Sequence, residues 1–517
     1  MRMIDLFDQG ARQFPDRDCL SDGENGWSYA TVRTLTQRIA AGLRGEGIGT
    51  GARIAVWSPN HAMAYACVLA ISRQNGIWVP INARNALEEN IYVLNNNQTE
   101  ILFVHSSFAG HVARVQAEVP SIRLVVTTDA PVEGLPFLDD WMPVDPEPAP
   151  DPLLPPETIC SQMSSGGTTG RPKGVMLSTR AWETMVATFH VMMPVTSPPV
   201  HLMVAPMTHA AGGVSFPLLP YGATNIFMTE TAPEKIMQMI EKHRVTHLFL
   251  PPTVIYVMLA HPKVRDYDYS SLQHFIYAAA PMSADKLKEA MEVFGPVMTQ
   301  TYGQAEAPMI ATYMSPADHA EAMNTNKHHR LLSCGRPTPY TRVEIMGEDG
   351  TILPQGESGE IVLRGEMVME GYFRQPEETA AASTHGWHHT GDIGRIDEDG
   401  FVYIVDRLKD MIITGGFNVY PSEVEQVIWT HAAVQDCAVI GVPHDKWGEA
   451  LKAVIELKPG ATVSEDEIIA LCKEKLGSVK APKSVDFWPE LPRSPVGKVL
   501  KRDIRAPYWE GKGRSVG

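Results

Sequence analysis

Short apolar segments alternate with longer segments of helical periodicity over most of this chain of 517 residues. RIAVWSP, ILFVHS and RLVVTT in the N-terminal part, and HLMVAPM, THLFLPP and HFIYAAAPMS in the middle, have the length and composition of strands. Between such runs, TLTQRIAAGLRGEG places apolar residues at helical spacing and carries glycine where a helix can end. Alternation of this kind predicts an α/β fold with mostly parallel strands.

A chain of this length exceeds one compact core, so about two to four domains are expected. A stretch rich in proline and aspartate at residues 143–157 predicts a linker or a surface crossing. From about residue 333 the segments become short strands separated by Gly and Asp, as in hairpins. After Asp406 strand and helix patterns mix again, which predicts a small α+β domain beyond a boundary near residues 407–409.

The net charge is −16, which argues against nucleic acid and anionic membranes as partners, because both reward a basic surface. MRMIDLFDQGARQF at the start has no apolar core of a secretory signal, and the apolar stretches fall short of a membrane span. The six cysteines lie far apart and form no CxxC pair. Reduced thiols in a cytoplasmic protein are therefore expected, with no stable membrane insertion.

Residues 163–175, MSSGGTTGRPKGV, form the segment that most directly indicates chemistry. Its glycines let backbone amides approach an anion, its hydroxyls add donors, and Lys173 adds a positive charge. A flexible linker can share this composition, but it seldom continues into a basic residue and an apolar run. Lys173 follows Pro172 and precedes Gly174, so the Gly-Lys-Ser/Thr pattern of kinase-type loops is absent. The segment predicts a phosphate loop of a different construction.

This loop resembles the phosphate loop of the adenylate-forming superfamily, which includes acyl-CoA synthetases, aryl-CoA ligases, luciferases of the firefly type and adenylation domains of peptide synthetases. Three further motifs of that superfamily follow in order. They are TYGQAEAP at 301–308, HHTGDIGRIDEDGFVYIVDRLKDMIITGGFNVYPSEVE at 388–425, and PRSPVGKVLKRDIR at 492–505. The resemblance therefore spans nearly the whole chain.

The resemblance implies a large N-terminal adenylate-forming domain over residues 1–407, with mixed sheets sandwiched by helices and a small distorted β-barrel. It implies a smaller, mobile α+β domain over residues 408–517 that carries the catalytic lysine and part of the CoA tunnel. The two domains would alternate between two reaction steps about a hinge at Lys409.

The implied first step joins a carboxylate to the α-phosphate of ATP and expels pyrophosphate. Two anions must meet, so the site must neutralise charge and align the attack. Lys498 is the catalytic residue expected to bridge the carboxylate and α-phosphate oxygens, and Glu306 and Thr168 are expected to hold Mg²⁺, which prefers oxygen ligands. Asp392 is expected to bind both ribose hydroxyls, with Arg407 as a second ribose or phosphate contact.

The full set of ATP and AMP contacts implied by the resemblance is Ser164, Ser165, Gly166, Gly167, Thr168, Thr169, Gly170, Lys173, Ala280, Pro281, Thr301, Tyr302, Gly303, Gln304, Asp392, Arg407 and Lys498. The superfamily usually has Thr immediately before the acidic residue of TYGQAE, and this chain has Ala305 there. A hydroxyl expected near the α-phosphate is therefore missing, and Thr301, Gln304 or a water would have to compensate.

The acyl site is expected beside His209, which is also a candidate catalytic residue, in a neighbourhood of small residues. Its predicted lining is His209, Ala210, Gly212, Ala279, Gly303 and Pro308. The CoA tunnel is expected to involve Lys409, Gly415, Gly416 and Phe417, where glycines leave room for the slim pantetheine chain.

The predicted function is an ATP- and Mg²⁺-dependent acid–CoA ligase acting on a hydrophobic acid, whether fatty, aromatic or ring-bearing. The alternatives change the acceptor to a carrier-protein thiol, or the second step to an oxygenation of the luciferase type. A third alternative is a nucleotide-binding regulatory protein without catalysis, against which Lys498, Glu306 and Asp392 argue. Small-molecule acid, ATP and CoA are the expected partners of a monomer or homodimer.

Overall fold

The computed structural model describes residues 1–165, 172–415, 417–444, 447–494 and 499–510, and the side chains of residues 409 and 418 lie outside this description. Contacts within the chain divide it into two compact units. The first contains Met1–Ala280, Lys286–Val343 and Leu363–His388, and the second contains Pro281–Asp285, Glu344–Val362 and His389–Gly517. The predicted boundary at residues 407–408 stays a prediction, since these units follow contact density alone.

The first unit is built on two mixed sheets with mostly parallel strands. The nine-stranded sheet runs in the order β15-β14-β13-β12-β11-β9-β10-β1-β2. Its strands are β1 (Asp18–Ser21), β2 (Gly26–Ser28), β9 (Val200–Met203), β10 (Thr224–Phe227), β11 (His247–Leu250), β12 (His274–Tyr277), β13 (Met298–Gln304), β14 (Ala307–Met314) and β15 (Arg336–Pro337). The seven-stranded sheet runs in the order β18-β8-β7-β4-β3-β5-β6. Its strands are β3 (Arg53–Trp57), β4 (Ile77–Ile81), β5 (Ile101–Val104), β6 (Leu124–Thr127), β7 (Ile159–Ser164), β8 (Gly174–Ser178) and β18 (Gly371–Tyr372).

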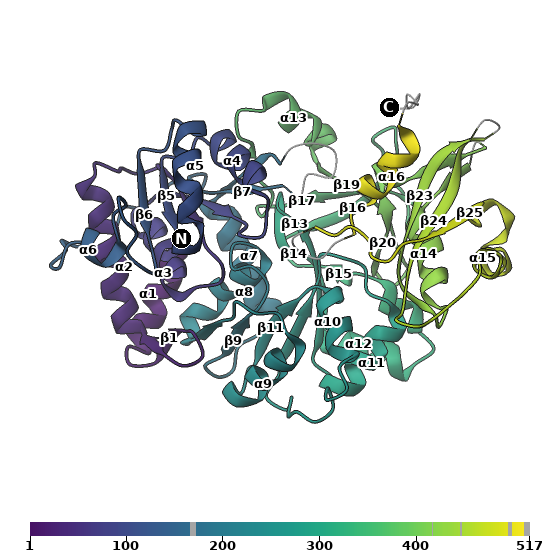
Figure 1. Cartoon of the computed structure of the whole chain (residues 1–517), viewed down its shortest axis with the longest axis horizontal. Coiled ribbons are helices and arrows are strands. Elements are labelled where there is room, and N and C mark those ends of the chain that lie inside the picture. The colour runs from purple at the N-terminus through teal and green to yellow at the C-terminus, as the bar shows by residue number, and fades with distance from the viewer. Residues whose placement is uncertain (166–171, 416, 445–446, 495–498, 511–517) are drawn as a thin grey trace. The chain divides into compact units, whose positions relative to one another are not determined.

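Helices lie between the two sheets and on their outer faces (Figure 1). Helices of the layer between the sheets pack on strands of one or both sheets; they include α3 (Ala62–Arg73), α7 (Thr179–Met192) and α8 (Ala210–Leu218). Helix α7 contacts β8 of one sheet and β14 of the other, so it joins the two layers. The other helical segments of this unit are α1 (Met3–Gln13), α2 (Tyr29–Gly45), α4 (Leu87–Asn96), η1 (Ser106–His111), α5 (Val112–Glu118), α6 (Leu138–Trp141), η2 (Leu219–Tyr221), α9 (Pro233–His243), α10 (Pro252–Leu259), α11 (Ala284–Phe294), α12 (Pro316–Asn324), η3 (His328–Leu332), α13 (Pro376–Ala381) and η4 (Thr384–Gly386).

The second unit holds a four-stranded sheet in the order β16-β17-β19-β20, in the region where a small barrel was predicted. It also holds a five-stranded sheet in which β22, β21, β24 and β23 follow in that order and β25 pairs with β24. The strands are β16 (Arg342–Met346), β17 (Gly359–Arg364), β19 (His388–Ile396), β20 (Val402–Arg407), β21 (Ile412–Thr414), β22 (Phe417–Val419), β23 (Val434–His444), β24 (Gly448–Leu457) and β25 (Ser484–Phe487). The helical segments are η5 (Leu408–Asp410), α14 (Pro421–Trp429), α15 (Glu465–Lys480) and α16 (Lys501–Trp509).

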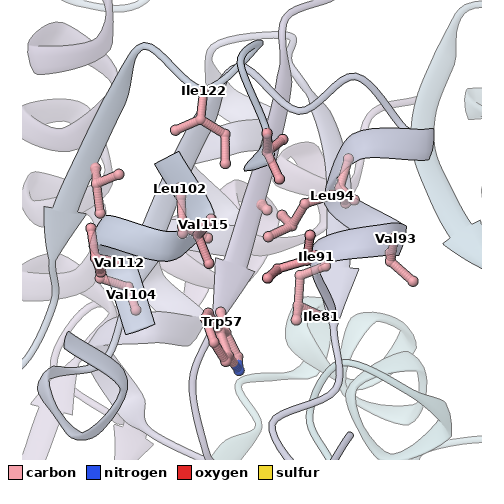
Figure 2. Close-up of a cluster of buried hydrophobic side chains, with 14 residues drawn as sticks. Trp57, Ile81, Ile91, Val93, Leu94, Leu102, Val104, Val112, Val115 and Ile122 are labelled. Carbon is pink, nitrogen blue, oxygen red and sulfur yellow. The ribbon is translucent and has the colours of Figure 1, made fainter. Parts of the chain in front are cut away.

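Helices cover both faces of the parallel strands, which explains why these strands are apolar along their whole length in the sequence. In β3, Ala55 and Trp57 point toward α4 and α5 in a buried cluster, shown in Figure 2, and the alternate residues point toward α3. The cluster consists of Ala55, Trp57, Val79, Ile81, Ile91, Val93, Leu94, Leu102, Val104, Val112, Val115, Val119, Ile122 and Val125. Each fully buried Val, Leu or Ile side chain of this cluster stabilises the folded state by about 1.5–3 kcal/mol.

All six cysteines are free thiols. Among the helices that the structure describes, none has the length and apolarity to cross a bilayer.

Truncation inside this cluster is expected to destabilise the first unit. Leu102→Ala removes a fully buried side chain of β5, and the cavity left behind should lower the free energy of unfolding by about 2–5 kcal/mol. The urea midpoint of unfolding measures this loss. Leu153→Ala is the matched control, because Leu153 is 100% exposed and its truncation should leave the midpoint unchanged. Equal midpoints for the two variants would contradict the packing described here.

Candidate active site

The stem of the predicted phosphate loop is a pair of antiparallel strands in the first unit. Strands β7 and β8 pair antiparallel up to Ser164 opposite Gly174. The Ser165 amide then donates to the Lys173 carbonyl at 3.0 Å, and the Lys173 amide donates to Ser165 Oγ at 2.9 Å. Ser165 therefore closes the stem with both its backbone and its hydroxyl. The predicted contacts Gly166, Gly167, Thr168, Thr169 and Gly170 lie outside the described residues.

Lys173 lies where this stem meets a segment about 200 residues further along the chain. Its Nζ is 4.6 Å from the centroid of the Tyr372 ring, and it forms an ion pair with Glu378. Tyr372 reaches this place because β18 pairs with β8, with Tyr372 opposite Val175. So short a strand leaves no periodic signal in the sequence, and Tyr372 is not among the predicted site residues.

Glu306 lies in the tight turn between β13 and β14, where Gln304 pairs with Ala307. The Tyr372 hydroxyl donates to Glu306 Oε1 at 2.9 Å, and the Met369 amide donates to the Glu306 carbonyl at 2.8 Å. Burial, together with the nearby Glu306 charge, raises the pKa of Tyr372 above its usual range, so the phenol acts as a donor. The structure thus brings two predicted elements, the phosphate loop and the acidic motif, to the same tyrosine.

Gly303 permits a close backbone approach in this motif. A Cβ on Gly303 would lie 2.7 Å from the Ala307 carbonyl oxygen and 2.7 Å from the Met309 amide nitrogen. Met309 has a φ of 69°, which is strained for a residue with a side chain, and its Sδ would lie 3.2 Å from a Cβ on Gly213 of α8. Met309 of this hairpin therefore lies close to Gly213 of α8.

Other predicted site residues of the first unit lie on β13 or just beyond the end of β12. Thr301 is buried, and its Oγ1 has no hydrogen-bond partner among the described residues. Tyr302 is also buried, and Gln304 Oε1 is 3.4 Å from His388 Nε2. Ala279, beyond the end of β12 and directly before Ala280, has a φ of 72°. Strained residues of this kind concentrate at functional sites.

His209 stands at the N-cap of α8, immediately before Ala210, and its side chain does not cap the helix. Its Nδ1 is 3.1 Å from Thr208 Oγ1. Burial, with the Arg84 charge as a second cause, lowers the pKa of His209 to about 4, so the imidazole is neutral near pH 7. Gly212 is needed one turn on, since a Cβ there would lie 1.8 Å from the Met207 carbonyl oxygen.

Asp392 and Arg407 face each other across β19 and β20 in the second unit. Arg407 Nε lies 3.4 Å from Asp392 Oδ1, and Asp392 is 6% exposed. The two predicted ribose contacts are therefore paired by strand register. Pro281 also belongs to this unit, whereas Ala280 and Pro308 belong to the first.

The predicted hinge and CoA residues follow Arg407 directly. Lys409 lies in η5, between β20 and β21. Gly415 has a φ of 58°, and its amide donates to the Trp447 carbonyl at 2.9 Å. Phe417 is 60% exposed at the start of β22. Gly416 and the catalytic candidate Lys498 lie outside the described residues.

Comparison with known proteins agrees with this order of motifs along the chain. Residues 7–373 match the family described as AMP-binding enzyme, and residues 423–498 match the AMP-binding enzyme C-terminal domain. The chain belongs to the AMP-binding enzyme family. A medium/long-chain-fatty-acid–CoA ligase of Mycobacterium tuberculosis is 36% identical over 497 residues, which cover 93% of this chain and 86% of the relative.

A feruloyl-CoA synthase of an Amycolatopsis species is 34% identical, with 96% of this chain and 97% of the relative covered. Among solved structures, an amide bond synthetase of Marinactinospora thermotolerans superposes with a TM-score of 0.88 at 29% identity, covering 98% of this chain and 100% of that one. These findings confirm three predictions: membership of the adenylate-forming superfamily, the α/β fold with a large and a smaller domain, and the class of AMP-forming acid–thiol ligase.

In this AMP-binding enzyme, the close approach at Gly303 predicts that a single methyl group will disturb the site. Gly303→Ala places a Cβ against backbone that cannot rotate away, so the β13–β14 turn must shift. We expect kcat/KM for the acid to fall about 5- to 150-fold, which corresponds to an overpacking penalty of about 1–3 kcal/mol. Pyrophosphate release at varied acid concentration measures it.

Gly45→Ala is the control for this variant, because nothing lies within 4 Å of a Cβ at Gly45. Its activity should equal that of the unsubstituted enzyme. Unchanged kcat/KM in Gly303→Ala would show that the turn tolerates the methyl group.

Proposed function

We propose that this chain is an ATP-dependent ligase that joins a hydrophobic carboxylic acid to CoA. In the first step the carboxylate oxygen attacks the α-phosphate, giving acyl-AMP and pyrophosphate. In the second step the CoA thiol attacks the acyl carbonyl and AMP leaves, with loss of the thiol proton. The observation that carries the proposal is the convergence of the phosphate-loop stem and the acidic motif on Tyr372 in the first unit.

CoA is favoured over a carrier-protein thiol as the acceptor. The two relatives described above, at 36% and 34% identity, are both named for CoA thioester formation, and each aligns with more than nine-tenths of this chain. Gly415 and Phe417 are the described residues that would line part of the CoA tunnel. An exposed aromatic ring beside a glycine with positive φ suits contact with a slim, partly apolar chain.

ATP would be held mainly through its phosphates by the first unit. The β- and γ-phosphates would be bound by Ser164, Ser165 and Lys173, together with the rest of the loop. The Thr301 hydroxyl, which has no hydrogen-bond partner among the described residues, would donate a hydrogen bond to the nucleotide or accept one from it. Glu306 and Thr168 suit Mg²⁺, because this ion takes one or two protein oxygens and shares its remaining positions with phosphates and water. When bound, Mg²⁺ would neutralise charge on the phosphate oxygens.

The second unit would supply the ribose and transition-state contacts. Asp392 would accept hydrogen bonds from both ribose hydroxyls, and its pairing with Arg407 keeps the carboxylate oriented. Lys498 would neutralise the charge that builds between the carboxylate and the α-phosphate. Lys409 would be the hinge about which the smaller domain moves before thioester formation.

The acid is proposed to be apolar, of the fatty or aromatic kind. Burial keeps His209 neutral near pH 7, so the imidazole adds no charge to the predicted acyl site. Met309 adds a flexible apolar wall. The named substrates of the two relatives, a medium or long fatty acid and ferulate, belong to these classes. A cytoplasmic location and a monomer or homodimer remain predictions.

The reaction is tested with separate assays for its two steps. The enzyme should catalyse ATP–pyrophosphate exchange with an apolar acid and, when CoA is added, form the thioester and AMP. Lys498→Ala should lose about 10²–10³-fold in exchange while thioester formation from supplied acyl-AMP persists, because the lysine serves only the first step. Lys475→Ala, an exposed lysine of the same unit, is the control.

No exchange with any acid in a panel of fatty, aromatic and ring-bearing acids would overturn the proposed function. Exchange without thioester formation, restored by a carrier protein, would move the acceptor from CoA to that protein. Near-normal exchange in Lys498→Ala would remove this lysine from the first step.

The ribose assignment predicts a change in sensitivity to 2′-deoxy-ATP. With Asp392 present, loss of the 2′-hydroxyl should lower kcat/KM about 10–100-fold, since a hydrogen bond to a charged acceptor is worth about 1.5–3 kcal/mol. In Asp392→Asn the neutral acceptor is weaker, so ATP and 2′-deoxy-ATP should differ by much less. Asp466→Asn, on the exposed face of α15, should keep the original ratio. The same ratio in Asp392→Asn would rule out a ribose contact.

A further inference from the structure

Tyr372 occupies a position that the established motifs do not explain. Its hydroxyl donates to Glu306 Oε1 at 2.9 Å, while the face of its ring lies 4.6 Å from Lys173 Nζ. One side chain therefore contacts both the acidic motif and the base of the phosphate loop, two elements that are more than 130 positions apart in the sequence.

Backbone contacts fix this side chain from both directions. The Tyr372 amide donates to Thr379 Oγ1 at 2.9 Å, and the Phe373 amide donates to the Gly174 carbonyl at 2.8 Å. The Glu306 backbone is tied to the same segment through the Met369 amide at 2.8 Å. Tyr372 is only 8% exposed, so packing restricts its rotamer as well.

The two contacts of Tyr372 are chemically distinct and can be removed separately. The phenol hydroxyl orients a carboxylate, and one Glu306 oxygen engaged in this way fixes the direction of the other. The ring face attracts an ammonium without removing any of its three N–H donors, so Lys173 is held in place while it remains able to bind phosphate.

We propose that Tyr372 is a positioning residue of the nucleotide site, which holds the Glu306 carboxylate with its hydroxyl and the Lys173 ammonium with its ring. This proposal rests on the proposed adenylating function, whose metal ligand is Glu306 and whose phosphate contact is Lys173. Tyr372 itself need not touch ATP.

Glu378 completes the arrangement as a displaceable anion. It forms an ion pair with Lys173 from α13, and its side chain is 54% exposed. An exposed pair is weak, so a triphosphate can replace this carboxylate at the ammonium. Glu378 thus pairs with Lys173 and lies one residue before the Thr379 that anchors Tyr372.

The test measures equilibrium binding of α,β-methylene-ATP by calorimetric titration with Mg²⁺ or with EDTA. The methylene bridge between its α- and β-phosphorus atoms cannot be broken, so this analogue cannot transfer its adenylyl group to the acid. Tyr372→Phe keeps the ring and loses the hydroxyl. It should weaken binding about tenfold with Mg²⁺ and leave binding in EDTA unchanged, because only the orientation of Glu306 is affected. Tyr372→Leu loses the ring as well and should weaken binding about five- to tenfold in EDTA too.

Glu378→Gln should move binding in the opposite direction. Removal of the competing carboxylate is expected to tighten binding up to about fivefold both with Mg²⁺ and in EDTA. Tyr269→Phe is the matched control, since its buried hydroxyl donates only to the Val264 carbonyl at 2.8 Å, and it should bind as the unsubstituted enzyme does.

The outcomes separate this proposal from the proposed function. If the unsubstituted enzyme binds the analogue and catalyses exchange but Tyr372→Phe binds equally well with Mg²⁺, the positioning role is wrong and the function stands. If the unsubstituted enzyme does not bind the analogue at all, the proposed function fails first. A loss in Tyr372→Phe that is the same with Mg²⁺ and with EDTA would indicate a structural role only. Should Tyr372→Leu fail to fold by circular dichroism, Tyr372→Phe and Glu378→Gln still decide the question.

Discussion

The pairing of β18 with β8 is the contact on which the arrangement of the nucleotide site depends. It is only two residues long, yet it places residues 371–372 beside the stem of the phosphate loop. Without it β8 would be the edge of its sheet, and an edge strand holds its neighbours loosely. The pairing covers this edge, positions α13 next to Lys173, and gives Tyr372 its two contacts. This short ladder thus brings Tyr372 to the stem of the phosphate loop, and Tyr372 in turn contacts Glu306 of the acidic motif.

The turn between β13 and β14 and the start of α8 are built on close approach of backbone. Gly303 and Gly212 are required there because backbone atoms occupy the space of a Cβ, and Met309 and Ala279 hold positive φ angles despite having side chains. Such strain costs about 1–3 kcal/mol at each position and persists only where the surrounding structure enforces it. The buried strands of the two sheets supply that enforcement, since both faces of each sheet are covered by helices.

Local pattern and the recognised motifs predicted much of this molecule. RIAVWSP, ILFVHS and RLVVTT contain β3, β5 and β6, because a continuous apolar run is typical of a strand that is buried on both faces. The contact partners could not be read in the same way. Tyr372 lies in GYFRQPEET, which has no period, and its partners Lys173 and Glu306 are chosen by strand register. The collision that makes Gly303 necessary is likewise a property of the folded hairpin and not of the local sequence.

Ion pairs of the second unit bear on the prediction that Lys498 is carried by a mobile domain. The segment that contains Lys498 is flanked by Arg493, which pairs with Asp436 at 2.8 Å and Glu456 at 3.2 Å, and by Lys501, which pairs with the buried Glu425 at 2.8 Å. Both flanks are thereby fixed to the body that contains β23, β24 and α14. Breaking the Lys501–Glu425 pair from one side would cost about 3–5 kcal/mol, because Glu425 is buried. The proposed alternation between two reaction steps would carry these anchored flanks as one body.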